Sequence, residues 1–183
     1  MKKHLFLFSI IFFLFSCKTE EKPNEPEIKP VAVEDLYQTL KINDLNLTID
    51  YPKNWSQIQV DSKILFSAAE NDTNPANIYR ENMVLNRIYN EMVIDSLLPI
   101  AESSVKIQYP EATNITTNKG INSNGMEYGL LSLSMERNNV MLTSETYYFI
   151  DSNHYYILNL GYDQKDVIIH RQICDHIFNS LKF

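Results

Sequence analysis

Histidine side chains are the first candidates for chemistry in this sequence, and their spacing limits what they can do. His170 and His176 lie six residues apart, about 120° around a helix, so they cannot share a metal ion without outside help. His154 lies in an expected turn beside Tyr155, where it could act as a general base with a carboxylate from a strand. That pair would make a hydrolase, which is the alternative function. The sequence predicts no metal site and no bound cofactor.

The other candidates for catalysis have patterns typical of structural residues. His170 and Cys174 fall on the apolar face of an expected helix, which predicts a hydrogen-bonded core histidine and a packed thiol. No glycine pattern suits a phosphate, and no serine-nucleophile motif occurs. Three carboxylates lie on adjacent expected strands and could approach one another: Glu127, Glu136 and Glu145. Exposed carboxylates that keep a protein soluble are far commoner than a catalytic acid–base pair. We therefore expect that the protein is not an enzyme.

Aromatic residues are more numerous than a core of this size requires. The chain has 11 tyrosines and one tryptophan, and tyrosine is favoured where an apolar body keeps a polar tip in water. Clustered on an open face, they would bind a protein, a peptide or a glycan. The candidate residues for this partner surface are Trp55, Tyr128, Tyr148, His154 and Tyr155. The alternative is that the aromatic side chains fill a sheet covered on both faces.

Residues 1–16 have the pattern of a secretory signal peptide. Lys2 and Lys3 precede an apolar run over 5–15, which is too short for the ~20 residues that a membrane-spanning helix needs. The following Leu14-Phe15-Ser16-Cys17 resembles the lipobox of bacterial lipoproteins. The resemblance implies that residues 1–16 are removed and that Cys17 becomes the acylated first residue.

Residues 17–36 combine the lipidated cysteine with an acidic, proline-rich tether. Pro23, Pro26 and Pro30 lie among charged residues, with almost nothing apolar to bury. The start, Lys18-Thr19-Glu20-Glu21, resembles the export signal of surface lipoproteins of the Bacteroidetes group; a solvated linker is the alternative. We therefore expect a bacterial cell-envelope protein, lipid-anchored at the outer membrane, on its periplasmic or surface face.

The acidic charge limits the direct partners. The net charge of −7 becomes −9 once Lys2 and Lys3 leave with the signal peptide. Phosphate groups repel such a chain, which argues against nucleic acid and anionic lipid headgroups as partners. Membrane contact is therefore expected through the lipid on Cys17, and Cys174 is left without a disulfide partner.

Strands dominate the expected domain, residues 37–183. Alternation of polar and apolar residues predicts a strand over 45–51, and 82–89 has strand-like composition. Residues 112–121 read as an edge strand. Two short turns, one of them Asn138-Asn139, separate three long strands and predict an antiparallel meander. These three strands span 126–137, 140–150 and 154–162.

Two helices complete the expected fold. The first spans 94–109, capped by Asp95 or Ser96 and stopped by Pro110, and the second is opened by Asp163 or Asp166. The apolar face of the second helix is expected to carry Val167, His170, Cys174, Ile177, Phe178 and Leu181.

The order of these elements resembles the PsbP-like superfamily, which includes the photosystem II PsbP subunit, a nuclear Ran-release factor and many bacterial lipoproteins. Its local marks are Tyr51-Pro52 followed by Trp55, the Tyr147 to Leu160 hairpin and a last helix ending Ser180-Leu181-Lys182-Phe183. The resemblance implies an α+β fold, with a predominantly antiparallel sheet of about six or seven strands flanked by helices in an α/β/α sandwich. The resemblance does not predict a ligand for this protein, because members of the superfamily bind unrelated partners.

The expected function is a non-enzymatic, lipid-anchored binding or assembly module in the envelope. Its partner would be a protein, a peptide or a glycan. A purely structural envelope protein, whose partner is another lipoprotein or a transporter, is the third possibility.

Overall fold

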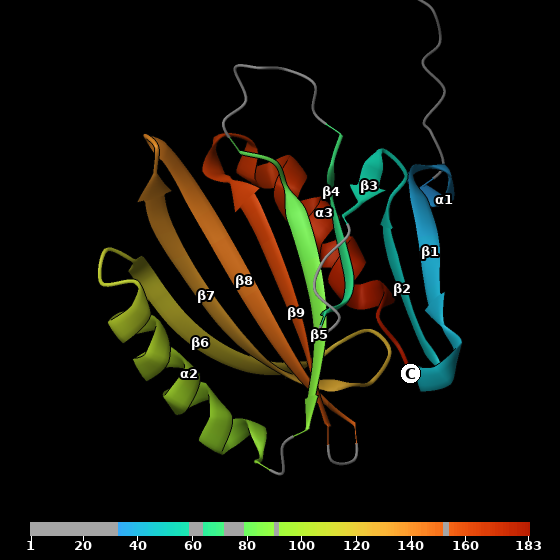
Figure 1. Ribbon diagram of the computed structural model, residues 1–183, viewed down its shortest axis with the longest axis horizontal. Coiled ribbons are helices and arrows are strands. Elements are labelled where there is room, and N and C mark those ends of the chain that lie inside the picture. The colour runs from blue at the N-terminus through green and yellow to red at the C-terminus, as the bar shows by residue number, and fades with distance from the viewer. Residues whose placement is uncertain (1–32, 59–63, 72–78, 90–91, 152–153) are drawn as a thin grey trace, which may run out of the picture. The chain divides into compact units, whose positions relative to one another are not determined.

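The computed structural model describes residues 33–58, 64–71, 79–89, 92–151 and 154–183 (Figure 1). They belong to one compact unit, Val31–Phe183. The predicted signal peptide, Cys17 and most of the tether fall within residues 1–32, outside the described residues. Among the described residues, no helix is both long enough and apolar enough to cross a membrane.

Strands make up most of the described residues. A seven-stranded antiparallel sheet has the order β3-β4-β5-β9-β8-β7-β6, and β1 and β2 form a separate hairpin. The α+β class expected from the sequence is confirmed. In chain order the elements are α1 (Val33–Leu36), β1 (Tyr37–Ile42), η1 (Asn43–Leu45), β2 (Leu47–Pro52), β3 (Trp55–Gln57), β4 (Ile64–Glu70), β5 (Asn82–Tyr89), α2 (Ile94–Gln108), β6 (Thr113–Ile121), β7 (Glu127–Arg137), β8 (Val140–Asp151), β9 (His154–Asp163), η2 (Gln164–Asp166) and α3 (Val167–Ser180).

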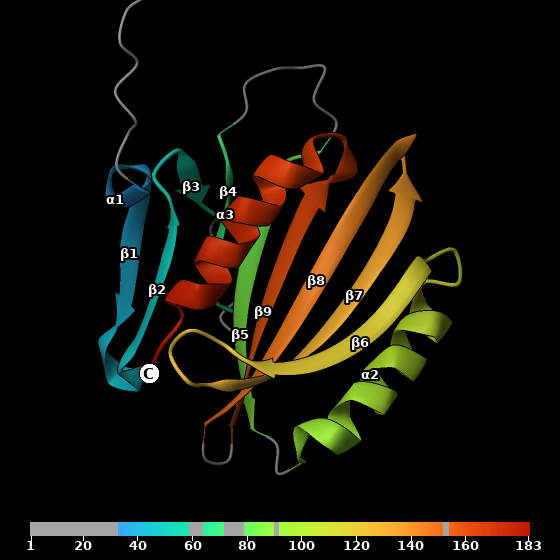
Figure 2. The same ribbon diagram turned by 180° about the vertical axis from the view of Figure 1, so that it is seen from behind.

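Both faces of the sheet bury apolar side chains. Along β9, Tyr156 and Leu158 belong to the core under α3, while the alternate residues Tyr155 and Ile157 pack with α2 on the other face. Figure 2 shows α3 lying across the strands. Successive side chains of a strand point to opposite faces, so the centre of the sheet is covered twice.

The β7-β8-β9 meander matches the prediction. β7 and β8 pair from Arg137 opposite Val140, and β8 and β9 pair up to Asp151 opposite His154. Asn138 and Asn139 both have positive φ, 53° and 61°. A two-residue hairpin turn of this kind needs positive φ at both central positions, and asparagine tolerates it.

The start of α2 differs from the prediction. Val93 is the N-cap residue of α2, and no side chain caps the helix, so the assignment of Asp95 or Ser96 as its cap is wrong. Asp95 instead forms an exposed ion pair with Lys119 of β6. Its carboxylate is therefore engaged with the neighbouring strand.

The start of α3 agrees in part. The Asp163 side chain accepts a hydrogen bond from the backbone N–H of Lys165 and caps η2, which leads into α3. Val167 was expected on the buried face, but it is exposed. The reason is that the first turn of α3 extends beyond the core that Cys174 and Ile177 join.

The β1–β2 hairpin packs against α3 at His176. The Tyr37 ring stacks on His176 with 3.7 Å between ring centroids, and His176 Nε2 lies 3.4 Å from Asp50 Oδ2. Thr48 and Lys182 exchange backbone hydrogen bonds of 2.9 and 3.1 Å. The first hairpin is thus fastened to both α3 and the segment after it.

The edges of the sheet are poor templates for another strand. β3 has only three residues. β6 is the other edge, as predicted, and its register shifts around Asn114, which has a φ of 51°. The Asn118 side chain accepts a hydrogen bond of 2.8 Å from the backbone N–H of Lys119. Short strands, bulges and locally satisfied backbone groups discourage edge-to-edge pairing.

We expect Asn139→Ala to lower the free energy of unfolding by about 1 kcal/mol, because alanine resists the left-handed conformation. Asn139→Gly should cost less, since glycine adopts positive φ freely. Urea denaturation of the purified variants measures both. Equal destabilisation by alanine and glycine would show that the backbone conformation of this turn is not what stabilises the hairpin.

Candidate functional site

The four predicted surface aromatics do not form a common surface. Trp55, Tyr148 and Tyr155 are buried, with exposed fractions of 4%, 9% and 0%. Trp55 and half-buried Tyr128 pack in the core under α3, whereas Tyr148 and Tyr155 pack under α2. The expectation of one open aromatic face is therefore corrected. These rings fill the two sides of the sheet, which was the alternative interpretation.

His154 is half-buried at the start of β9. Its Nδ1 lies 3.2 Å from Nη2 of Arg87, and its ring meets the Tyr89 ring edge-on, with 5.7 Å between centroids. Within the described residues no carboxylate lies at ion-pair distance from His154. Asp151 of β8 lies opposite His154 in the strand register, and the hydrolase alternative, His154 with a strand carboxylate, stays a prediction.

One of the three strand carboxylates is buried, contrary to expectation. Glu145 is 2% exposed and forms an ion pair with Arg171 of α3, while the Tyr147 hydroxyl donates a 2.7 Å hydrogen bond to Glu145 Oε2. Arg171 Nε also lies 3.0 Å from Asp175. Glu127 and Glu136 are exposed. A buried carboxylate is tolerated here because a cation and a hydroxyl satisfy it.

The surroundings of Glu145 also set the acidity of its neighbours. Burial, and then the negative charge of Glu145, raise the pKa of Tyr147 and of Cys174. Burial lowers the pKa of Arg171, but the nearby acidic groups, Glu145 first and then Tyr147 and Asp175, together outweigh it and the pKa is raised. Cys174 is buried, so the prediction of a packed rather than a reactive thiol is confirmed.

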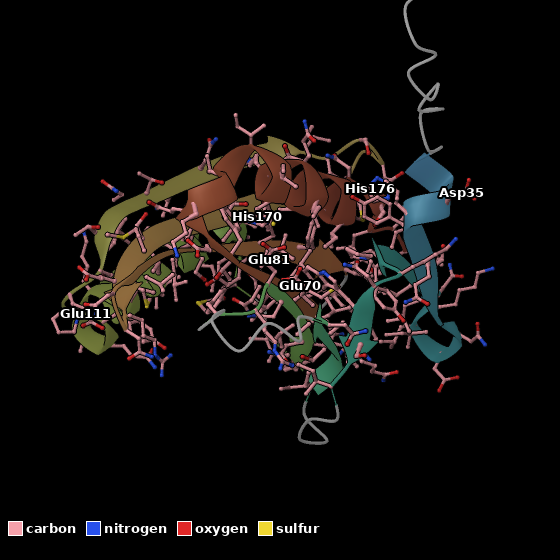
Figure 3. All side chains as sticks on the ribbon, turned by 90° about the horizontal axis from the view of Figure 1, so that it is seen from above. Asp35, Glu70, Glu81, Glu111, His170 and His176 are labelled. Atoms are coloured by element: carbon pink, nitrogen blue, oxygen red, sulfur yellow. The ribbon has the colours of Figure 1, made fainter. Side chains whose placement is uncertain are left out.

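His170 of α3 lies near Glu81, as Figure 3 shows. It is half-buried and its Nδ1 contacts the buried carboxylate of Glu81. No three potential metal-binding side chains of the described residues come together. These internally paired charges therefore fasten α3 to the sheet and offer no open site.

The β3–β5 groove is an open feature on the opposite side of the sheet. Met83 and Leu85 of β5 point into the core under α3, so the alternate residues Asn82 and Val84 face away from it. On this second face α2 lies over β6 and β7 and also packs on Tyr148 of β8 and Tyr155 of β9. The β3–β5 part of the face lies outside this contact and has a groove of about 360 Å³. Its lining residues are Ser56, Ile58, Ser67, Ala69, Glu70, Asn71, Arg80, Asn82 and Val84.

The lining of the β3–β5 groove suits non-covalent binding. Ser67 and Ala69 are small and buried, and Ile58 and Val84 add apolar surface. Glu70 and Arg80 bring opposite charges, and neither forms an ion pair within the described part of the chain. A concave surface with a few polar groups is typical of a binding site. No sequence pattern predicted this groove, because several of its residues are small and they come from separate strands.

The amino-acid sequence matches no family model and no curated protein. The fold is similar to solved structures at low identity. The cyanobacterial PsbP protein (CyanoP) of Synechocystis sp. PCC 6803 has a TM-score of 0.60 and 12% identity, covering 80% of this chain and 91% of that one. LpqN of Mycobacterium tuberculosis, described as involved in cell envelope biogenesis, has a TM-score of 0.57 and 11% identity, covering 80% and 89%.

A Pseudomonas aeruginosa protein of unknown function, PA94, described as a putative regulator, has a TM-score of 0.54 and 13% identity. The match covers 96% of the PA94 chain and 80% of this chain. The chain therefore has a PsbP-like α+β fold. At these identities the likeness concerns the fold alone.

Arg171→Met is expected to lower the free energy of unfolding by about 3 kcal/mol, because it leaves the Glu145 carboxylate buried without its cation. Lys106→Met is the matched control, since Lys106 pairs with Glu102 on the exposed surface of α2. That variant should change stability by less than about 0.5 kcal/mol. Chemical denaturation measures both, and similar losses would contradict the structural role of Arg171.

Proposed function

We propose that this protein is a non-enzymatic binding or assembly module of the bacterial cell envelope, and that the β3–β5 groove receives a segment of its partner. The observation that carries the proposal is the groove itself. Among the described residues no helix packs on this part of the sheet, and its charged groups, Glu70 and Arg80, have no ion-pair partner there. A protein or peptide segment, or a glycan, fits such a mixed surface.

The absence of an internal catalytic pair among the described candidates is consistent with binding. His154 is hydrogen-bonded to Arg87, and Cys174 is buried with a raised pKa. Nucleophilic catalysis needs an accessible nucleophile within reach of a base. Neither of these two residues meets that requirement in this arrangement.

The location in the envelope follows from the N-terminal sequence. The lipobox-like Leu14 to Cys17 segment supports removal of residues 1–16 and lipidation of Cys17, with anchoring at the outer membrane. The likeness to LpqN, which is described as an envelope-biogenesis protein, is compatible with this location. Several acyl chains on one cysteine are sufficient for a stable anchor.

Cys17→Ser is expected to move the protein from the membrane fraction to the soluble fraction, because no thiol remains to accept the lipid. Fractionation followed by mass spectrometry of the mature amino terminus measures both effects. Cys174→Ser is the control and should leave the protein in the membrane fraction. An unacylated wild-type terminus would overturn the anchoring proposal.

The groove is tested by a photo-crosslinking amino acid at Ile58, which lines it, and at Ile107, which is exposed on α2. In intact cells Ile58 should give a specific adduct and Ile107 should not. Val84→Trp, which fills the groove, should reduce the Ile58 adduct on the order of tenfold. Equal adducts from both positions, or none from Ile58, would contradict the proposal.

A further inference from the structure

A second group of side chains gathers where β5 ends and β9 begins. The register places Arg87 opposite Tyr156 and Tyr89 opposite His154, so all four side chains lie on the face that α3 covers. Figure 2 shows that these strand ends project beyond α3. Tyr89 is accordingly 65% exposed. We name these four residues the Arg87 cluster.

The guanidinium group of Arg87 is held in a fixed position. Its central carbon lies 5.7 Å from the centre of the Tyr156 ring, which packs on Phe183 with 4.3 Å between centroids. Nη2 of Arg87 is 3.2 Å from His154 Nδ1. Because arginine can only donate, Nδ1 must accept, and this places the proton of a neutral His154 on Nε2. The cluster thus presents one cation and one further N–H donor beside an exposed tyrosine.

Arg87 shares its face of the sheet with an acidic residue, Asp151, which lies opposite His154 in the strand register. Within the described residues no carboxylate forms an ion pair with Arg87, and its Nε is buried without a hydrogen-bond partner. Arg171, by contrast, pairs with both Glu145 and Asp175. A pre-positioned guanidinium with unused donors favours a planar oxyanion, above all a carboxylate.

We infer that the Arg87 cluster is a binding site for a carboxylate group carried by a protein partner. The surrounding surface favours a protein. Ile88 and Ile150, on the opposite face of the same strand ends, are 43% and 39% exposed, and Val93 before α2 is 61% exposed. Arginine and tyrosine are typical residues of protein-binding hot spots, and these exposed apolar side chains lie on the reverse face of the same strand ends. One arginine on an acidic chain attracts an anionic membrane only weakly.

The test uses the ¹⁵N-labelled full chain with Cys17→Ser and two matched probes, N-acetyl-leucine and its neutral amide. The carboxylate probe should shift the NMR signals of Arg87 Nε–H and the His154 ring saturably at millimolar concentration. The amide should bind at least tenfold more weakly. Arg87→Gln should abolish the response of His154, and Arg137→Gln, an exposed arginine of β7, should leave it unchanged.

Arg87→Lys keeps the charge but removes the planar pair of donors, so it should weaken the response several-fold even if Arg87→Gln fails to fold. Equal shifts with the amide, or an unchanged response in Arg87→Lys, would overturn the proposal. Stronger shifts of the same signals with phosphatidylglycerol vesicles would assign the site to a membrane instead. The probes act away from the β3–β5 groove, so a failure here is distinguishable from a failure of the proposed function.

Discussion

The rest of the structure depends on the burial of both faces of β9. Tyr156, Leu158 and Leu160 join the core under α3, and Tyr155 packs under α2 on the reverse side. A strand that is apolar on both faces gains stability only if both are covered. That requirement places a helix on each side. It also determines where the groove lies, because α2 packs over β6 to β9 and, among the described residues, no helix packs on β3, β4 and β5 on that face.

Charges reinforce this arrangement between α3 and the sheet. The Arg171–Glu145 pair and the His170–Glu81 contact join successive residues of α3 to two separate parts of the chain. Isolated charges would be expensive at these buried positions, so each contact makes a displaced α3 unfavourable. The helix is thus fixed in register as well as packed. Arg80 and Arg87, by contrast, form no ion pair with another described residue.

Local patterns in the sequence predicted the elements well and their surroundings poorly. The alternation along β2, the Asn138-Asn139 turn and the edge position of β6 follow from short-range chemistry, and all three are present. The burial of Glu145 depends on Arg171, 26 residues later, and no local pattern reveals such a partner.

For the candidate sites, too, the sequence predicted individual residues better than their surroundings. Tyr155 and Trp55 look like surface aromatics by composition, yet their burial is set by helices distant in sequence. The β3–β5 groove is lined by residues from separate strands, and no local sequence pattern shows that they lie together. His154 was found as a residue of interest because it opens a strand beside tyrosines. Its cationic neighbour, Arg87, is brought to it by the pairing of β5 with β9.

The central position of β9 has a consequence for how the chain acquires its structure. β9 is the last strand made, yet it alone joins the β3-β4-β5 part of the sheet to the β8-β7-β6 part. Before it is synthesised, β5 and β8 each lack a neighbour along one side, and both are rich in apolar residues. Such half-sheets are prone to aggregate. Nascent or truncated chains are therefore expected to be prone to aggregation until the final 30 residues, which begin with β9, are present.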